Sequence, residues 1–202
     1  MKLSNQEQKS NLRKEILHKR NALNQFDISA KSKLIQKNII KTYEFIESKT
    51  IGLYLPTGSE VETRDIINHT LNSGRKLLLP RIVSNDIRYY TVEQKDFDND
   101  SFDMNRFGIK EPKIINGNVD FIDLLIVPGI AFDSYGYRIG YGFGYYDKYL
   151  TNKKYSKCFG LAYDFQFIEN RIPTFAYDRK IDALVTESGT HIFNTLNFTK
   201  SV

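Results

Sequence analysis

Apolar and polar residues follow two alternating periods along this chain, and their order predicts an α/β fold. Apolar residues recur every three to four positions over residues 4–24 and 28–47, which is typical of amphipathic helices. Short apolar runs bounded by glycine, proline and polar residues predict strands over residues 51–55, 76–80, 87–92, 124–127 and 158–162, and we expect about six strands in all. Residues 64–73 and 145–150 predict further helices. This alternation favours a single three-layer domain over residues 1–202, with a largely parallel or mixed sheet flanked by helices.

The first predicted helix carries two cations on one face. Ser4 and Glu7 have the spacing of a capping box, which marks the start of the helix. Lys9 and Arg13 are four residues apart and therefore lie on the same side of the helix. From this spacing alone, the simplest interpretation is a solvated basic face.

Three further expectations concern the ends of elements. Tyr43 and Ile46 continue the apolar stripe of the second helix and are expected to face the core. Thr63 is expected to cap the helix over residues 64–73. The tail after Glu187 is expected to form a loosely ordered end.

The most unusual stretch is VPGIAFDSYGYRIGYGFGYYDKYL, residues 127–150, which holds five glycines. It begins at a predicted buried strand and ends in a predicted helix, with a long loop over residues 128–144 between them. In this arrangement, backbone N–H groups and a helix N-terminus can face a phosphate. Glycine at positions 140, 142 and 144 would let the backbone approach a polyphosphate or adopt positive φ.

A long surface loop with glycines for flexibility is the simpler alternative for residues 128–144. A functional loop is favoured because loops longer than about 15 residues in compact domains are usually functional or disordered. This loop is also rich in aromatic residues, which disordered segments lack. Its Gly140-Tyr-Gly142-Phe-Gly144 spacing fits neither a Walker A loop nor a dinucleotide fingerprint. The residues alone therefore indicate an anion or nucleotide site and do not identify a reaction.

The string PG-x-AFD-x-x-G-x-R-[IL]-G-x-G-x-GYYD, which runs from Pro128 to Asp147, resembles the signature of the 5-formyltetrahydrofolate cyclo-ligase (5,10-methenyltetrahydrofolate synthetase) family. The resemblance extends over nearly the whole chain, because Pro80-Arg81, residues 108–112, Gln166 and residues 181–187 also match family segments. It implies an enzyme, an ATP-dependent ligase that forms C–N bonds. The implied substrate is 5-formyltetrahydrofolate, with or without a polyglutamate tail, and the implied cofactors are ATP and Mg²⁺.

The resemblance also implies roles for individual residues. The residues that match the family's ATP site are Lys9, Arg13, Arg138, Ile139, Gly140, Tyr141, Gly142, Phe143, Gly144, Tyr145 and Tyr146. Those that match its folate site are Leu55, Glu60, Tyr141, Gly142, Phe143, Gly144 and Tyr145. Arg138 and Tyr145 are the implied catalytic residues, and Asp147 and Asp182 the implied Mg²⁺ ligands.

The implied chemistry depends mainly on positioning. Transfer of the γ-phosphoryl group of ATP to the formyl oxygen makes that oxygen a good leaving group, and N10 of the folate then closes the ring. Such a reaction needs the reacting atoms in line and the developing charge neutralised. The sequence offers no candidate histidine for a general base. One position departs from the family pattern, because Phe143 stands where some members carry a lysine, and Lys148 is a candidate for the missing charge.

Composition and charge limit the number of domains, the cellular location and the class of ligand that we expect. The chain has 202 residues, 41% hydrophobic and 26% charged, which suits one soluble domain. It shows no membrane-length apolar run, no signal-peptide core and a single cysteine, Cys158, which is expected to be buried. We therefore expect a cytoplasmic monomer that binds neither membrane nor nucleic acid. The net charge of +5 suits a polyanionic ligand, although a solvated lysine-rich surface explains it equally well. The histidines at positions 18, 69 and 191 have no metal-ligand spacing and are expected at the surface.

Two other classes of protein stay open. A nucleotide- or folate-binding regulatory protein of the same fold would lack catalysis, but Arg138 and Asp147, whose loss would support that class, are both present. An RNA-binding protein is favoured by the charge and the tyrosines, and would show salt-sensitive RNA binding without ATP turnover.

Overall fold

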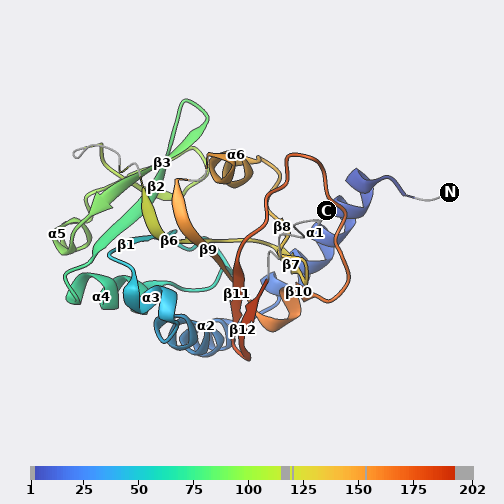
Figure 1. Cartoon of the computed structure of the whole chain (residues 1–202), viewed down its shortest axis with the longest axis horizontal. Helices are drawn as coiled ribbons and strands as arrows, with labels where there is room; N and C mark the ends of the chain where they lie inside the picture. The colour runs from blue at the N-terminus through green and yellow to red at the C-terminus, as the bar shows by residue number, and fades with distance from the viewer. Residues whose placement is uncertain (1–2, 115–118, 120, 153, 194–202) are drawn as a thin grey trace, which may run out of the picture.

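A seven-stranded mixed sheet organises the molecule (Figure 1). The computed structural model describes residues 3–114, 119, 121–152 and 154–193. The spatial order is β12–β11–β9–β6–β1–β2–β3, and the strands are β1 Thr50–Gly52, β2 Lys76–Val83, β3 Asp86–Val92, β6 Ile122–Val127, β9 Tyr155–Leu161, β11 Ala183–Thr186 and β12 Gly189–Ile192. The five central strands are parallel, and β3 and β12 are antiparallel edges. The predicted α/β class and mixed sheet are confirmed.

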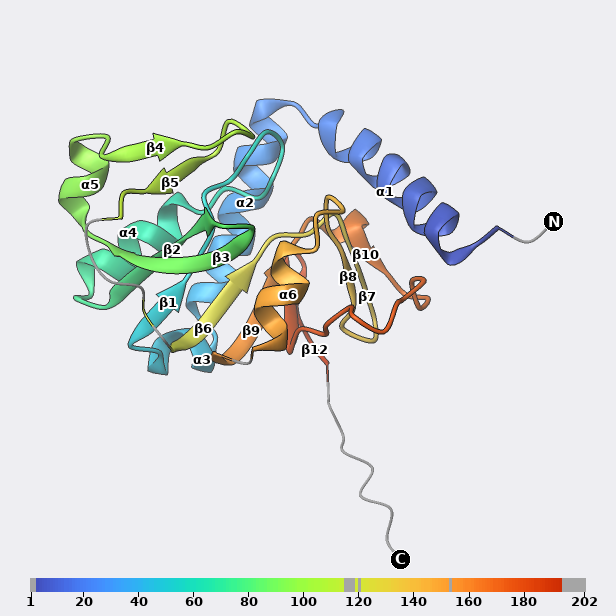
Figure 2. The same ribbon diagram turned by 90° about the horizontal axis from the view of Figure 1, so that it is seen from above.

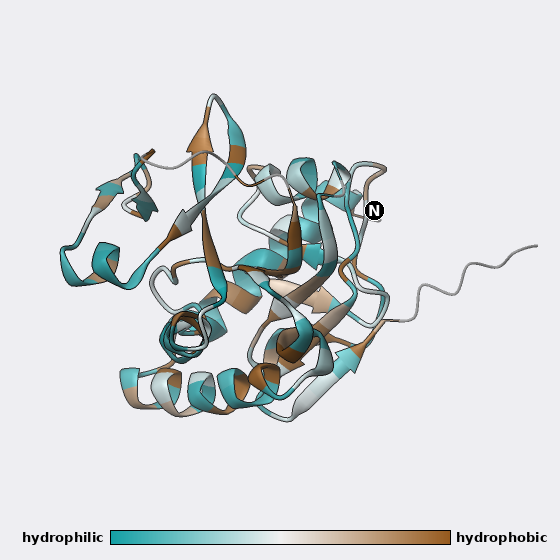
Figure 3. Cartoon of the chain, turned by 60° about the vertical axis from the view of Figure 1, so that its left-hand side comes forward, coloured by the Kyte–Doolittle hydropathy of each residue, from teal (hydrophilic) through white to brown (hydrophobic). Residues whose placement is uncertain are grey.

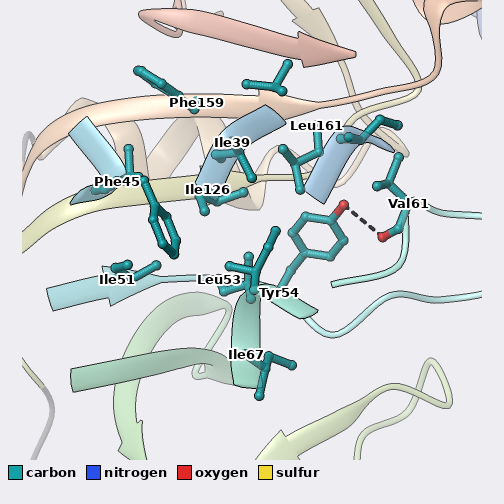
Figure 4. Packing of buried hydrophobic residues seen from close by; sticks show 14 of the residues in the cluster. Ile39, Phe45, Ile51, Leu53, Tyr54, Val61, Ile67, Ile126, Phe159 and Leu161 are labelled. Atoms are coloured by element: carbon teal, nitrogen blue, oxygen red, sulfur yellow. Dashed lines mark hydrogen bonds between the residues drawn. The ribbon is translucent and has the colours of Figure 1, made fainter. Parts of the chain in front are cut away.

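Helices cover both faces of this sheet. The helices α2 (Gln25–Ile40), α3 (Tyr43–Glu47) and α4 (Arg64–Asn72) lie on one face, and α6 (Tyr145–Thr151) lies on the other (Figure 1). Alternate strand residues serve the two faces. In β2, for example, Leu77 and Leu79 belong to the cluster drawn in part in Figure 4, whereas Leu78 packs in the cluster that contains Tyr149 and Leu150 of α6. Figure 3 shows hydrophobic residues concentrated in the central strands.

A second, smaller sheet supports the N-terminal helix. It contains β7 (Ala131–Asp133), β8 (Arg138–Ile139) and β10 (Phe167–Ile168), in the order β10–β7–β8. The helix α1 (Asn5–Asn21) lies beside this sheet and extends away from its short connection to α2 (Figure 2). Ile16 of α1 packs in one buried cluster with Ile130 and Ile139. The capping box of Ser4 and Glu7 is present as predicted.

The remaining elements are short. The helix α5 (Gln94–Asp98) follows β3, β4 (Phe102–Met104) and β5 (Lys110–Pro112) form an antiparallel ribbon, and η1 (Asp164–Gln166) is one turn of 3₁₀ helix. Ser84 and Asn85 join β2 to β3 with φ values of 49° and 63°. Two successive residues with positive φ are typical of a type I′ hairpin turn, which explains this tight connection.

Two predictions about helices were wrong. The helix predicted over residues 28–47 is interrupted, because Thr42 is extended and its hydroxyl accepts a hydrogen bond from the Phe45 N–H (3.2 Å), which starts α3. Phe45 is then buried, while Tyr43 is 74% and Ile46 59% exposed.

Thr63 occupies the N-cap position of α4, as predicted, but its side chain does not cap the helix. Thr63 precedes α4, but its hydroxyl donates to the Tyr54 carbonyl (3.1 Å) instead of capping the helix. Gln36 of α2 provides the cap, because its Oε1 accepts hydrogen bonds from the N–H groups of Asp65 (2.8 Å) and Ile66 (3.3 Å).

The end of the described chain is more regular than predicted. Residues after Glu187 were expected to be loosely ordered, but Gly189–Ile192 form β12, which pairs with β11 along four residue pairs. The rest of that predicted tail, residues 194–202, lies outside the described residues. Within the part of the chain that the structure describes, no helix is long and apolar enough to cross a membrane.

Candidate ligand-binding site

A cavity of about 880 Å³ lies at the carboxyl ends of the parallel strands. One wall follows β1 and contains Tyr54, Leu55, Thr57 and Glu60; we call it the Glu60 wall. The facing wall consists of lining residues 138–147, and we call it the glycine wall. Parallel α/β sheets place ligands beyond the carboxyl ends of their strands, and a cavity of this size suits a small organic ligand.

The N-terminal helix contributes cations to this cavity. Lys9 and Arg13 both line it, so the spacing of these residues does place them on one functional face. Lys9 is buried, forms an ion pair with Asp178, and lies 4.7 Å from the ring centroid of Phe175. Arg13 donates from Nε to the Gly140 carbonyl (2.9 Å). The helix therefore holds both a cation in the cavity and the backbone of the glycine wall.

The predicted long loop over residues 128–144 is partly ordered, because β7 and β8 form a hairpin within it. The irregular part that faces the cavity is short. Gly142 (φ 108°) and Gly144 (φ 71°) have backbone conformations that favour glycine, which explains these two residues. Gly140 has no positive φ, and a Cβ there would meet nothing within 4 Å. A side chain at position 140 would therefore be unfavourable only if it collided with a bound ligand.

Arg138 and Asp147 form an ion pair at the base of the glycine wall. Arg138 is 4% exposed, and its Nη1 donates to Asp147 Oδ1 (3.1 Å) and to the Arg179 carbonyl (3.3 Å). The backbone N–H of Arg179 also donates to Asp147 Oδ1 (3.0 Å). Both of these hydrogen bonds to the Asp147 carboxylate use Oδ1, and the side chain lines the cavity. These hydrogen bonds fix the orientation of the Asp147 carboxylate and therefore of its second oxygen, Oδ2. A side chain that binds a metal needs its orientation fixed in this way.

The Glu60 wall is built around a buried carboxylate. Glu60 is 6% exposed, and its Oε2 accepts a hydrogen bond from the Thr57 N–H (3.0 Å). Burial raises the pKa of this carboxyl, while the positive charge of Arg20 and hydrogen bonds from Thr57 and Tyr141 oppose that increase. The wall thus presents a carboxylate whose charge depends on its neighbours.

Arg20 is a residue that the sequence analysis missed. It is 2% exposed and donates to Ser59 Oγ (3.2 Å), the Gly129 carbonyl (3.4 Å) and the Tyr141 hydroxyl (2.5 Å). The signal was available, since Arg20 lies seven residues after Arg13 and therefore on the same helical face.

Aromatic rings gather at the outer end of the glycine wall. Phe143 is 61% exposed and lies 4.9 Å from Phe107 and 5.9 Å from Tyr145, measured between ring centroids. The Tyr145 hydroxyl accepts a hydrogen bond from Arg106 Nη2 (3.0 Å). Phe107 and Glu111 also line the cavity, so the family-like segment 108–112 does lie beside it. The position that departs from the family pattern thus joins an aromatic cluster.

Other predicted residues divide between the cavity and the scaffold. The lining includes the expected site residues Leu55, Glu60, Ile139, Gly140, Tyr141, Gly142, Phe143, Gly144, Tyr145, Tyr146 and Asp147. Arg81, expected to follow a strand, instead lies within β2 and binds Asp103 (2.6 Å) and the Pro112 carbonyl (2.9 Å). Gln166 donates to the carbonyls of Gly129 (3.0 Å) and Ile130 (2.9 Å).

Asp182, the second predicted metal ligand, is not among the residues that line the cavity. Its Oδ2 accepts a hydrogen bond from the Cys158 N–H (2.8 Å), and its Oδ1 lies 4.0 Å from Lys157 Nζ. No cluster of three or more histidine, cysteine or acidic residues able to hold a metal occurs among the described residues. The chemistry of Asp147 fits Mg²⁺, which can be held by one carboxylate together with oxygens of a bound ligand. The role of Asp182 as a second metal ligand stays a prediction.

The cysteine and two of the three histidines lie where the sequence predicted them. Cys158 is fully buried, and burial raises the pKa of its thiol, which disfavours a nucleophilic role. His18 and His69 are exposed, as predicted. His191 differs, because it is half-buried and its ring stacks on Phe167 with a centroid separation of 4.4 Å.

The fold and this site define an α/β protein with a charged ligand cavity at the carboxyl ends of parallel strands. Residues 5–187 match the model of the 5-formyltetrahydrofolate cyclo-ligase family, and the chain belongs to this family of ligases. A probable 5-formyltetrahydrofolate cyclo-ligase of Schizosaccharomyces pombe is 33% identical over 177 residues, covering 79% of this chain and 85% of that protein. The 5-formyltetrahydrofolate cyclo-ligase of Escherichia coli K12 is 30% identical over 151 residues, covering 71% and 80%.

Solved structures agree with this assignment. The 5,10-methenyltetrahydrofolate synthetase of Aquifex aeolicus superposes with a TM-score of 0.80 at 36% identity, covering 92% of this chain and 93% of that one. The enzyme of the same name from Mycoplasma pneumoniae gives a TM-score of 0.68 at 25% identity, covering 89% and 98%. The family resemblance expected from the sequence is confirmed.

Proposed function

We propose that this protein is an ATP-dependent 5-formyltetrahydrofolate cyclo-ligase that produces 5,10-methenyltetrahydrofolate, ADP and phosphate. The observation that carries the proposal is the pairing of two unlike walls in one cavity. The Glu60 wall presents a buried carboxylate, and the facing wall presents glycines with Arg138, close to Lys9 and Arg13. Such a cavity suits a ligand with N–H donors at one end together with a polyphosphate.

Glu60 is proposed to bind the pterin ring. An ionised carboxylate is acceptor-only and matches the amino and ring N–H donors of a pterin. Leu55 and Tyr54 line the same wall and provide apolar contact for a flat ring. Tyr54 is itself anchored, because its hydroxyl donates to the Val61 carbonyl (3.2 Å; Figure 4).

Lys9, Arg13 and Arg138 are proposed to bind the phosphates of ATP, together with the backbone N–H groups of residues 140–144. Arg138 donates its hydrogen bonds to Asp147 and Arg179 from Nη1, and Arg13 donates to the Gly140 carbonyl from Nε. Among the described residues, the other guanidinium N–H groups of these two arginines therefore have no protein acceptor. Guanidinium forks of this kind match phosphate oxygens well.

The proposed reaction needs little covalent participation by the protein. Transfer of the γ-phosphoryl group makes the formyl oxygen a leaving group. N10 then forms a bond to the formyl carbon, the C–O bond breaks with its electron pair going to phosphate, and the N10 proton passes to solvent. The chain's part is to hold the formyl oxygen in line with the phosphorus and to neutralise charge, which are large contributions in phosphoryl transfer. Arg138 and Tyr145, at the glycine wall, are the residues proposed to act there.

Mg²⁺ would neutralise charge on the phosphates when bound. Asp147 is the residue proposed to hold it, with the phosphate oxygens completing the ligand set, and Asp182 stays a predicted second ligand. A cytoplasmic location, a monomeric state, the absence of membrane or nucleic-acid binding, and the use of polyglutamylated folate stay parts of this proposal.

The direct test is the absorbance of 5,10-methenyltetrahydrofolate when purified protein is mixed with 5-formyltetrahydrofolate and Mg-ATP. We expect a rise that requires ATP and Mg²⁺, with one ADP formed per product. Omitting ATP in one control and Mg²⁺ in another separates the two requirements. Folded protein that binds both ligands but gives no rise would contradict the proposed catalysis and favour a regulatory protein of the same fold.

A further inference from the structure

We infer that Arg20 is a positioning residue that sets the carboxylate of Glu60 and the glycine wall at the same time. This inference rests on the proposed function, because it assigns Arg20 a part in binding the folate substrate. Arg20 does not line the cavity, so it is expected to act through Glu60 and Tyr141 rather than by touching substrate.

The contacts of Arg20 join three segments that are far apart in the sequence. From α1 its guanidinium reaches Ser59 beside Glu60, the Gly129 carbonyl after β6, and the Tyr141 hydroxyl in the glycine wall. Its guanidinium also lies 5.8 Å from the centre of the Tyr141 ring. Ser59 in turn donates to Asn21 Oδ1 (2.6 Å), so α1 is tied to the Glu60 wall by two neighbouring residues.

The single proton of the Tyr141 hydroxyl determines which groups donate and which accept in this hydrogen-bond network. A guanidinium can only donate, so the Tyr141 oxygen accepts from Arg20 and keeps its own proton to donate. The neighbouring Glu60 carboxylate is an acceptor toward which that proton can point, and the interaction with Tyr141 lowers the pKa of Glu60. Tyr141 therefore relays the position of Arg20 to Glu60, while its backbone is part of the glycine wall.

Charge gives Arg20 a second effect on the same carboxylate. Burial raises the pKa of Glu60, and Arg20 is the strongest influence that lowers it. The other groups that face Glu60 are the Thr57 N–H and the phenols of Tyr54, Tyr141 and Tyr146, none of which carries positive charge. Removing Arg20 should therefore leave Glu60 protonated over a wider pH range, and a protonated carboxyl loses an acceptor for the pterin donors.

Three variants separate the contributions of Arg20. Arg20→Met removes charge and hydrogen bonds at similar length, Arg20→Lys keeps the charge without the planar fork, and Tyr141→Phe removes only the relay. Lys19→Met is the matched control, because Lys19 is an exposed neighbour on α1 whose Nζ pairs with Glu15 (2.7 Å). For each variant, kcat and the KM for both substrates are measured across pH, together with circular dichroism and Tm.

We expect Arg20→Met to raise the KM for 5-formyltetrahydrofolate by about 30-fold, the scale seen when a buried charged partner is truncated. The acidic limb of kcat/KM for the folate should move to higher pH. Arg20→Lys should restore that limb but still raise the KM for ATP, since a single ammonium cannot hold Ser59, Gly129 and Tyr141 together. Tyr141→Phe should raise the KM for both substrates, and Lys19→Met should match the wild type in all respects.

A purely structural role gives a different pattern. In that case kcat would fall with the folded fraction while both KM values and the pH profile stayed at their wild-type values, and the inference would be wrong. If the wild type shows no ATP-dependent turnover, the proposed function fails separately, and calorimetric binding of 5-formyltetrahydrofolate becomes the readout. Weaker binding by folded Arg20→Met than by the wild type would then still support the inference, and equal binding, or none by either protein, would overturn it.

Discussion

The two walls of the cavity differ in how their polar groups are satisfied. On the Glu60 wall, Glu60 and Tyr54 are 6% and 3% exposed, and each is hydrogen-bonded to a nearby backbone group, while Arg20 of α1 binds the adjacent Ser59. On the glycine wall, Tyr141 and Phe143 are 48% and 61% exposed, and arginines of α1 hold the backbone and the Tyr141 hydroxyl from outside. Buried polar groups must be satisfied within the protein, whereas exposed ones can exchange partners. One wall is thus preformed, and the other is suited to adjust around a ligand.

The largest effect is expected at the base of the glycine wall. Arg138→Ala should lower kcat by about 10²- to 10³-fold, the scale measured when a preorganised charge-stabilising donor is removed. Steady-state kinetics of the purified variant measures the loss, with Arg138→Lys as the control that retains a positive charge. Because Arg138 is buried, circular dichroism and Tm must show that the variant is folded. Near-normal kcat in folded Arg138→Ala would remove Arg138 from the proposed chemistry.

A smaller and more selective effect is expected on the preformed wall. Glu60→Gln should raise the KM for 5-formyltetrahydrofolate by about 30-fold and leave the KM for ATP unchanged, because a neutral amide presents N–H donors toward the pterin donors. Initial rates with each substrate varied in turn provide the measurement. An equal rise in both KM values would mean that the two walls do not bind different ligands.

The difference in order between the walls can be measured directly. In ligand-free protein, amide hydrogens of residues 140–144 should exchange with solvent faster than those of β6, because the loop is exposed whereas most of β6 is buried. Saturating Mg-ATP should slow exchange in the loop and leave β6 unchanged. Hydrogen exchange followed by mass spectrometry tests this, and a loop already protected without ligand would contradict the comparison.

The aromatic cluster should contribute least to binding. Phe143→Ala removes the ring contacts with Phe107 and Tyr145, each of a kind worth about 1 kcal/mol. We expect a KM increase of about 5-fold or less for either substrate, with only a small decrease in Tm because Phe143 is exposed. Phe143→Tyr keeps the ring and serves as the control. A loss of kcat comparable to that of Arg138→Ala would show that the cluster does more than line the cavity.

The opposite end of the sheet provides a stability control. Asp123 accepts hydrogen bonds from the N–H groups of Lys49 and Thr50, both at 2.9 Å. Burial raises the pKa of Asp123, but the hydrogen bonds from Thr50 and Lys49 outweigh it, and the net pKa is lowered from 3.8. The stabilisation is therefore present above pH 3.8 and is lost as the pH falls through the folded-state pKa.

Asp123→Ala should accordingly lower the free energy of unfolding by about 1 kcal/mol at pH 7, and by less near pH 3. Denaturant titrations at the two pH values measure this difference. Both KM values should stay at their wild-type levels, because Asp123 is not among the residues that line the cavity. A pH-independent difference would mean that the carboxylate charge is not involved.

Periodicity predicted what depends on local sequence. The parallel strands and the helix at Tyr145 followed from apolar spacing, and helical geometry placed Lys9 and Arg13 on one face, although only the family resemblance assigned that face to the site. The signature from Pro128 to Asp147 identified the family, but the β7–β8 hairpin inside it has only two residues in β8 and gives almost no pattern to read.

What the sequence could not show depends on contacts between distant segments. Gln36 caps α4 from α2, and nothing near Thr63 in the sequence indicates that a side chain from another helix takes that position. Arg20 resembles any other cation of a basic helix until the fold brings Ser59, Gly129 and Tyr141 around it. The short strand β12 exists because β11 offers an edge to pair with, which a four-residue segment does not reveal alone.

The ion pair between Lys9 and Asp178 has a consequence for the affinity of anions. Asp178 also accepts a hydrogen bond from the Phe175 N–H (2.6 Å), so its carboxylate is held beside Lys9 in the absence of any ligand. An incoming phosphate must therefore compete with an internal anion for the same ammonium group. Binding becomes an exchange of one anion for another, and its dependence on ionic strength should be weaker than the number of cations in the cavity suggests.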